Sequence, residues 1–204
     1  KDFLKLKKLL SYSKKNNSVV ACLIKKNILF SKKKSNKKNY IKSDISRETF
    51  IKELLRKIGS KTKLISTTGY TSRELYQIRT KHNLKKGKDF YMVGGMGHSS
   101  MVALGASLQT NKQIICLDGD GSMIMHLGSL TNIGYSAKKN YKHILLNNFC
   151  HESVGGQKTV AENLNFQKLS IGAGYKKYFY LNEQKKVNKI LKKFLFSQGP
   201  CLLE

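Results

Sequence analysis

Five short apolar runs, each followed by a polar turn, limit the folds that this chain can adopt. They have the length and the apolar content of buried strands, and they lie at 63–67, 90–93, 114–117, 143–146 and 201–204. Amphipathic segments with helical spacing stand between them. Strands that alternate with helices and are apolar on both faces predict an α/β fold, with an open, doubly wound parallel sheet covered by helices on both faces.

The helices expected between these strands have recognisable ends. Ser46 can cap a helix that Gly59 ends, and Thr71 or Ser72 can cap the next one, with Glu74 in its first turn. Further helices are predicted at 101–109, 126–137, 167–175 and 188–196. The polar turns should then gather at the carboxyl edge of the sheet, where such folds bind ligands.

The regular pattern begins only at about residue 45. Before it, 2–10 predicts a short helix and 18–24 a buried strand, and the lysine- and asparagine-rich segment 31–44 is typical of a linker. We therefore expect the tail of one domain at 1–30 and a second domain at 45–204. Because the chain starts with Lys1 and shows no leader, we expect a piece of a longer cytoplasmic protein.

The formal charge of +27 allows a polyanion-binding module, but the lysines lie in scattered runs and no nucleic-acid motif accompanies them. The four cysteines have no metal-binding spacing and sit in or beside apolar runs, so we expect reduced, mostly buried thiols. No apolar run approaches the ~20 residues of a membrane span.

Two of the turns carry oxygen ligands. Gly119 and Gly121 flank Asp120 directly after one strand, and Asn147 and Asn148 follow the next strand. The glycines allow a tight turn and a close approach to a ligand, while carboxylate and amide oxygens suit Mg²⁺. The amides of Gly121 and Ser122, at the start of a helix, suit a phosphate.

This arrangement resembles the signature of thiamine-diphosphate enzymes. The resemblance implies that Asp120, the side-chain oxygen of Asn148 and the backbone carbonyl of Cys150 hold Mg²⁺, which binds the cofactor diphosphate. It also implies that Met96 supports the folded cofactor and that the Gly94 carbonyl accepts a hydrogen bond from its aminopyrimidine. The other implied cofactor contacts are Thr67, Thr68, Gly69, Gly95, Gly119, Gly121 and Ser122.

Four segments resemble more closely the decarboxylases that act on phosphonopyruvate or sulfopyruvate: STTGYTSRELY, VGGMGHSS, LDGDGSMIMHLGSL and LNNFCHESVGGQ. The resemblance implies nonoxidative decarboxylation of a 2-oxo acid to an aldehyde, phosphonoacetaldehyde in the case of phosphonopyruvate. His151 and Glu152 are then candidates for proton transfer or substrate contact, and His98 and Lys158 for contact with the anionic groups of the substrate.

The same resemblance identifies 1–30 as the tail of a pyrimidine-binding domain. That domain supplies the activating glutamate across a subunit interface, which implies at least a dimer and an inactive fragment.

Several alternatives stay open at this stage. The two asparagines can form a simple turn, Met96 can be an ordinary core residue, and His151 a structural donor. Arg73 can bind substrate or form a surface ion pair. The chain can also be a noncatalytic remnant of such an enzyme.

Overall fold

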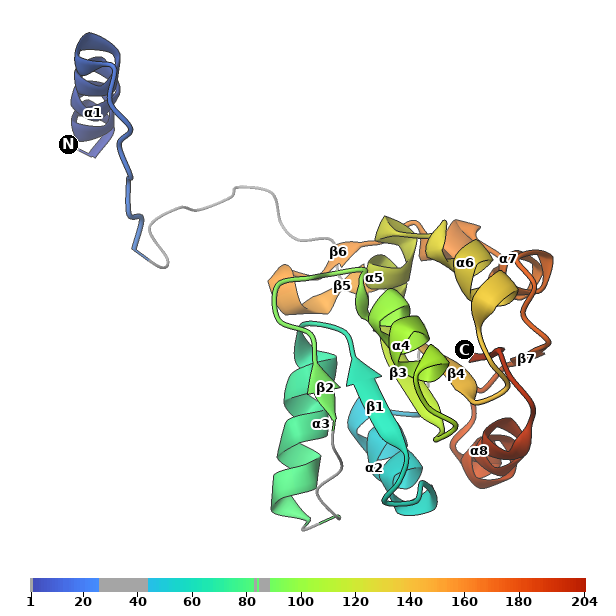
Figure 1. Ribbon diagram of the computed structural model, residues 1–204. Coiled ribbons are helices and arrows are strands. Elements are labelled where there is room, and N and C mark those ends of the chain that lie inside the picture. The colour runs from blue at the N-terminus through green and yellow to red at the C-terminus, as the bar shows by residue number, and fades with distance from the viewer. Residues whose placement is uncertain (1, 26–43, 83, 85–88) are drawn as a thin grey trace. The chain divides into compact units, whose positions relative to one another are not determined.

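The computed structural model describes residues 2–25, 44–82, 84 and 89–204 (Figure 1). The chain divides into two compact units, Lys1–Asn39 and Tyr40–Glu204. The expected linker at 31–44, and with it the boundary near residue 31, falls almost entirely outside the described residues.

The first unit contains helix α1, Asp2–Asn16, which is longer than the expected 2–10. The buried strand expected at 18–24 is wrong. Residues 18–25 form no strand, and Val19 and Leu23 are almost fully exposed. A strand needs neighbours to satisfy its backbone, and within the described part of the chain the pairing strands all lie between Lys63 and Leu203.

The second unit is built on a six-stranded parallel sheet with the order β2-β1-β3-β4-β8-β7. Its strands are β1 Lys63–Ser66, β2 Phe90–Tyr91, β3 Ile114–Gly119, β4 Tyr141–Leu146, β7 Lys177–Phe179 and β8 Cys201–Leu203. A short antiparallel pair, β5 Cys150–His151 and β6 Gln157–Lys158, lies apart from it. The five predicted strands are confirmed, whereas β5, β6 and β7 were not predicted.

Helices cover both faces of this sheet, as the alternation of elements predicts (Figure 1). One face packs against α2 Arg47–Lys57, α3 Tyr70–Lys81 and α8 Val187–Phe196. The other packs against α4 Ser99–Leu108, α5 Asp120–Met125, α6 Ser129–Ser136 and α7 Phe166–Gly172. Neighbouring residues of β3 alternate between the two cores, with Ile115 and Leu117 in one and Ile114 and Cys116 in the other.

Some helix ends differ from the expectation. Ser46 does cap α2, accepting a hydrogen bond from the Thr49 amide, but α2 ends at Lys57 with Ile58 as its cap rather than at Gly59. Gly69 precedes α3 in place of a hydroxyl cap, and Glu74 lies beyond the first turn. The Ser72 hydroxyl instead donates to the Thr67 carbonyl at 2.7 Å, which fixes the turn after β1. The helix predicted at 126–137 is found as α6, which begins three residues later, and a separate short helix, α5, precedes it.

The cysteines are free, and three of the four are buried, as expected for core thiols. Burial raises the pKa of the Cys116 and Cys201 thiols, which keeps them protonated at neutral pH. Among the described helices, none combines the length and the apolar character that a membrane span requires.

Candidate cofactor and metal site

The carboxyl ends of β1, β3 and β4 meet at one edge of the sheet and form a small cavity of about 80 Å³, here called the cradle. Its lining includes residues from all four turns predicted to bind the cofactor. From the predicted set it contains Thr67, Thr68, Met96, Gly119, Asp120, Gly121, Ser122, Asn148, Cys150, His151 and Glu152. Segments that lie far apart in the sequence, from Arg47 to Ser153, thus contribute to a single site.

Asp120 is the charged ligand candidate of the cradle. It is the first residue of α5 and only 2% exposed. Burial raises the pKa of its carboxyl group above the usual value, although hydrogen bonds from the Thr159 hydroxyl and the Gly121 amide act in the opposite direction. A buried carboxylate of this kind is stabilised by a cation, so its environment fits a metal ligand.

Thr159 was not predicted, and it is the side chain that holds Asp120. Its hydroxyl donates to Asp120 Oδ2 at 2.5 Å, and its backbone amide donates to the Phe149 carbonyl at 3.0 Å. One residue thereby connects the turn after β3 with the turn after β4. No sequence motif predicts this contact, because Thr159 is a single threonine after a glycine pair.

Ser122 connects the other parts of the cradle. Its hydroxyl oxygen accepts hydrogen bonds from the Thr67 hydroxyl at 2.8 Å and from the Gly97 amide at 3.1 Å. The turn after β1, the start of α5 and the segment that carries Met96 are therefore fixed relative to one another. Gly69, another predicted cofactor contact, packs closely against Ser153. A Cβ at position 69 would come within 2.9 Å of the Ser153 hydroxyl oxygen.

The two asparagines have different surroundings. Asn148 lines the cradle, where its Oδ1 accepts a hydrogen bond from the Cys150 amide at 3.2 Å. Asn147 instead donates from Nδ2 to Glu204 at 2.8 Å, on the other side of the turn. Asp120, Asn148 and Cys150 thus line one cradle, and each carries an oxygen that can bind a metal ion. This set of donors fits Mg²⁺. The bonds from the Phe149 and Cys150 amides also show that both asparagines form the simple turn considered as an alternative.

His151 and Glu152 follow the turn after β4, here called the metal turn for its candidate ligands Asn148 and Cys150, but the two side chains are held differently. The His151 ring lies directly over Gly121, where a Cβ would come within 2.3 Å of its Cε1 atom. The glycine is therefore required for the imidazole to reach the cradle. Glu152 accepts a hydrogen bond from Arg47 at 2.9 Å and faces Asn148 Nδ2 at 3.4 Å.

Arg47 is a second residue that sequence reasoning missed. It comes from the start of α2 and makes a bidentate ion pair with Glu74 at 2.7 and 2.8 Å, besides its contact with Glu152. The hydrogen bond to Glu74 raises the pKa of the Arg47 guanidinium group above its usual value, and the hydrogen bond to Glu152 raises it as well. Arg47 thereby ties the metal turn to α2 and α3.

The two residues expected to meet the substrate lie elsewhere. His98 is exposed and stacks on His126, with ring centroids 4.2 Å apart, and Lys158 pairs with Glu162 at 3.6 Å on the surface. Gly94 and Gly95 precede Met96 in a turn, where the Gly94 carbonyl accepts a hydrogen bond from the Met96 amide. None of these four residues lines the cradle in the described part of the chain.

Beneath the turn after β3 lies a fully buried polar network that includes His143, a residue without an assigned role in the sequence. Asp118 Oδ1 accepts a hydrogen bond from the Gly119 amide at 2.9 Å, and Oδ2 lies 3.4 Å from His143 Nε2. The other ring nitrogen of His143 lies 2.8 Å from the Tyr175 hydroxyl. The network therefore connects the core with the backbone of the Gly-Asp-Gly turn.

Residues 67–204 match the family described as thiamine pyrophosphate enzyme, C-terminal TPP binding domain. The chain belongs to this family. Thiamine pyrophosphate is another name for thiamine diphosphate, and the matched segment contains every lining residue of the cradle except Arg47.

Individual relatives agree with this assignment. The chain is 35% identical over 155 residues to phosphonopyruvate decarboxylase of Streptomyces viridochromogenes, a match that covers 75% of this chain and 37% of the relative. It is 38% identical over 125 residues to sulfopyruvate decarboxylase subunit beta of Methanocaldococcus jannaschii, covering 61% of this chain and 64% of the relative. The chain thus spans little more than a third of the first relative.

A solved structure has the same fold. An X-ray structure of a protein from Mycobacterium smegmatis, assigned as thiamin diphosphate-dependent, superposes with a TM-score of 0.63 at 18% identity. The match covers 78% of this chain and 31% of that protein. At this identity the likeness supports the α/β fold alone.

Proposed function

We propose that this chain is the diphosphate-binding part of a thiamine-diphosphate- and Mg²⁺-dependent decarboxylase that converts 3-phosphonopyruvate to phosphonoacetaldehyde and CO₂. The observation that carries the proposal is the meeting of Asp120 and Asn148 in one cradle, on a chain of this family. When bound, the cofactor accepts the electrons released with CO₂. The phosphonate substrate follows the Streptomyces relative.

Within this function, the residues of the cradle have separate tasks. Asp120, Asn148 and the Cys150 carbonyl hold Mg²⁺, and Thr67, Thr68 and Ser122 surround the diphosphate. His151 is the candidate for moving a proton, since its ring lies over Gly121 at the cradle. For Glu152 we propose a supporting task, because its carboxylate is engaged by Arg47.

The domain organisation belongs to the same proposal. Residues 1–30 are the tail of a pyrimidine-binding domain, 31–44 a linker and 45–204 the diphosphate-binding domain. The activating glutamate comes from a pyrimidine-binding domain across a subunit interface, so the active form is at least a dimer. A cytoplasmic enzyme fits this reaction.

A second substrate has support of similar strength. The relative from Methanocaldococcus jannaschii is a sulfopyruvate decarboxylase subunit, and the identity to it is 38%. Phosphonate and sulfonate groups have the same shape and differ in charge by about one unit at neutral pH, given a second phosphonate pKa near 6–7. The residues assigned to Mg²⁺ and the diphosphate would serve the same cofactor in both reactions, so they do not distinguish the two acids.

The test uses the full-length protein and measures the release of CO₂ and aldehyde from both acids, with and without thiamine diphosphate and Mg²⁺. We expect cofactor-dependent release from phosphonopyruvate, and its loss in Asp120→Ala. Faster turnover of sulfopyruvate would retain the reaction and replace the substrate. No release from either acid by a cofactor-loaded enzyme would refute the decarboxylase proposal.

A further inference from the structure

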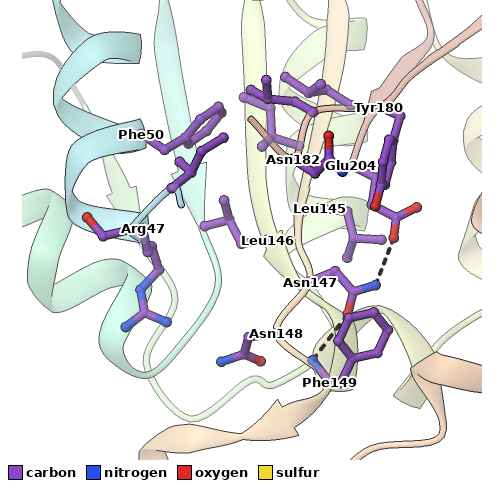
Figure 2. Close-up of a pocket in the computed structure, with 15 residues that line it drawn as sticks. Arg47, Phe50, Leu145, Leu146, Asn147, Asn148, Phe149, Tyr180, Asn182 and Glu204 are labelled. Carbon is purple, nitrogen blue, oxygen red and sulfur yellow. Dashed lines mark hydrogen bonds between the residues drawn. The ribbon is translucent and has the colours of Figure 1, made fainter. Parts of the chain in front are cut away.

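Glu204 stands at the end of β8, next to the metal turn. Strand β8 pairs with β4 in parallel register, with Leu203 opposite Ile144. The residue after Leu203 therefore lies at the level of the turn that follows β4. From there the half-buried carboxylate accepts a hydrogen bond from Asn147 Nδ2 at 2.8 Å (Figure 2).

The carboxylate of Glu204 is held in place by β7. Its second oxygen, Oε2, accepts a hydrogen bond from the Tyr178 hydroxyl at 2.6 Å. Burial and the contact with Glu204 raise the pKa of Tyr178, so the phenol remains a donor. The backbone amide of Glu204 also donates to the Phe179 carbonyl at 2.9 Å. The acceptor that faces Asn147 is therefore rigid.

Asn147 transmits this position to the turn. Its Oδ1 accepts a hydrogen bond from the Phe149 amide at 3.3 Å, which Figure 2 shows on the side opposite to Glu204. Phe149 has φ = 58°, a left-handed conformation that a residue with a Cβ rarely adopts. The peptide units around Phe149 decide where the Asn148 side chain and the Cys150 carbonyl point.

A carboxylate suits this task because it accepts hydrogen bonds and donates none. It therefore selects one of the two orientations of the Asn147 amide, the one with Nδ2 toward Glu204 and Oδ1 toward the Phe149 amide. The opposite orientation would set two oxygens against each other and leave the Phe149 amide facing a donor. The charge also strengthens the contact.

We propose that Glu204 is a positioning residue for the metal site, acting through Asn147 to hold the Phe149 turn that presents Asn148 and Cys150 to Mg²⁺. This inference rests on the proposed function, because it takes those two residues as metal ligands. It thereby assigns a role in metal binding to the residue that directly follows β8, the last strand in the sequence. The cavity of about 440 Å³ beside this turn is lined by Phe50, Leu146 and Tyr180 among others, and it gives the contact its half-buried setting (Figure 2).

The test measures Mn²⁺ binding to the full-length protein loaded with thiamine diphosphate, by the electron paramagnetic resonance signal of the free ion. We expect Glu204→Leu and Asn147→Ala each to weaken Mn²⁺ binding about tenfold, as changes next to metal ligands typically do. The double variant should lose no more than either single one, because both act through one contact. Glu204→Gln, which keeps an acceptor, should stay within about threefold.

Tyr178→Phe is the matched control. It removes one of the bonds that hold Glu204 in place but leaves the contact with Asn147 and the backbone bond to Phe179, so Mn²⁺ affinity should fall by less than in Glu204→Leu, about threefold at most. Thermal unfolding of each variant without metal checks that the domain is folded. If Glu204→Leu does not fold, Asn147→Ala decides the question.

The outcomes separate the two proposals. Wild-type affinity in Glu204→Leu or Asn147→Ala, with binding lost in Asp120→Ala, would overturn the task of Glu204 and leave the metal site intact. A double variant that loses the product of the two single effects would also overturn it. If the protein binds no Mn²⁺, or if Asp120→Ala binds it normally, the metal site itself is refuted and the inference with it.

Discussion

The turns after β3 and β4 meet at the same cradle but are supported in different ways. The β3 turn rests on a fully buried network, in which Asp118 contacts both the Gly119 amide and His143. The asparagine side chains of the β4 turn are held by half-buried or exposed partners, with Glu204 at Asn147 and Glu152 at Asn148, although the Phe149 carbonyl also accepts a bond from the Thr159 amide. One turn is thus part of the core, and the other is fixed from the surface.

This difference indicates which property each turn controls. Removing a partner inside the core leaves a polar group buried without compensation, so a change beneath β3 should lower the stability of the whole domain. Changes around β4 allow water to replace the lost partner. They should therefore affect the geometry of metal binding while the domain remains folded.

The largest effect should come from the buried network. We expect His143→Leu to lower the free energy of unfolding by about 3 kcal/mol, because it takes the imidazole away from the buried Asp118 carboxylate. Urea denaturation followed by circular dichroism measures this. Tyr175→Phe removes only a hydroxyl and should cost about 1 kcal/mol. A loss below 1 kcal/mol in His143→Leu would mean that the network does not support the β3 turn.

The next prediction compares the two proposed side-chain ligands of the metal ion, Asp120 and Asn148. Asp120→Ala should weaken Mg²⁺ binding in the presence of thiamine diphosphate by at least about a hundredfold, since even changes next to ligands cost 10–100-fold. Asn148→Ala should cost less, because it removes a neutral oxygen and no charge. Isothermal titration calorimetry provides both constants. Equal losses in the two variants would contradict the charged role of Asp120.

A third test uses pH on the metal-free protein. Because burial raises the pKa of Asp120 in the folded state, its negative charge destabilises the fold at neutral pH. Asp120→Asn should therefore be more stable than the wild type at pH 7, and this advantage should shrink as the pH falls through the raised pKa. Urea denaturation across this range measures the difference. An advantage that is constant with pH would rule out the titration of Asp120 as its cause.

The smallest effect is expected at the surface of the β4 turn. Glu152→Gln removes the negative charge that pairs with Arg47 on this side. Because the Glu152 side chain is 44% exposed, the free energy of unfolding should change by less than about 1 kcal/mol. Arg56→Gln, which breaks the exposed pair with Glu53, is the control at a distance from the cradle. A loss of several kcal/mol in Glu152→Gln would mean that the β4 turn, like the β3 turn, supports the stability of the whole domain.

The sequence predicted much of the sheet and the centre of the site. Apolar runs bounded by turns marked the strands that carry Asp120 and Asn148, because parallel strands buried on both faces are apolar throughout. The short strand β7 was missed, since KYF has only three residues and a charged start. Val19 and its neighbours were assigned to a strand for their composition, although composition does not reveal whether a partner strand exists.

The supporting residues were beyond such reasoning. Thr159, Arg47 and Glu204 match no motif, and each acts through a contact between distant segments that only the folded chain defines. His98 and Lys158 were chosen because they stand next to motifs, but neighbours in a helix or strand point in different directions. Lys158 accordingly faces solvent, and the adjacent Thr159 points toward Asp120.

The contact between Asn147 and Glu204 spans 57 residues of sequence. During synthesis on the ribosome, Asn147 emerges well before its acceptor, with α7, β7 and α8 still to follow. A nascent or truncated chain that lacks β8 would have both asparagines but not the geometry we assign to them. Tight uptake of the metal ion would then depend on the completion of the sheet, and a chain cut short before Glu204 would bind the ion more weakly.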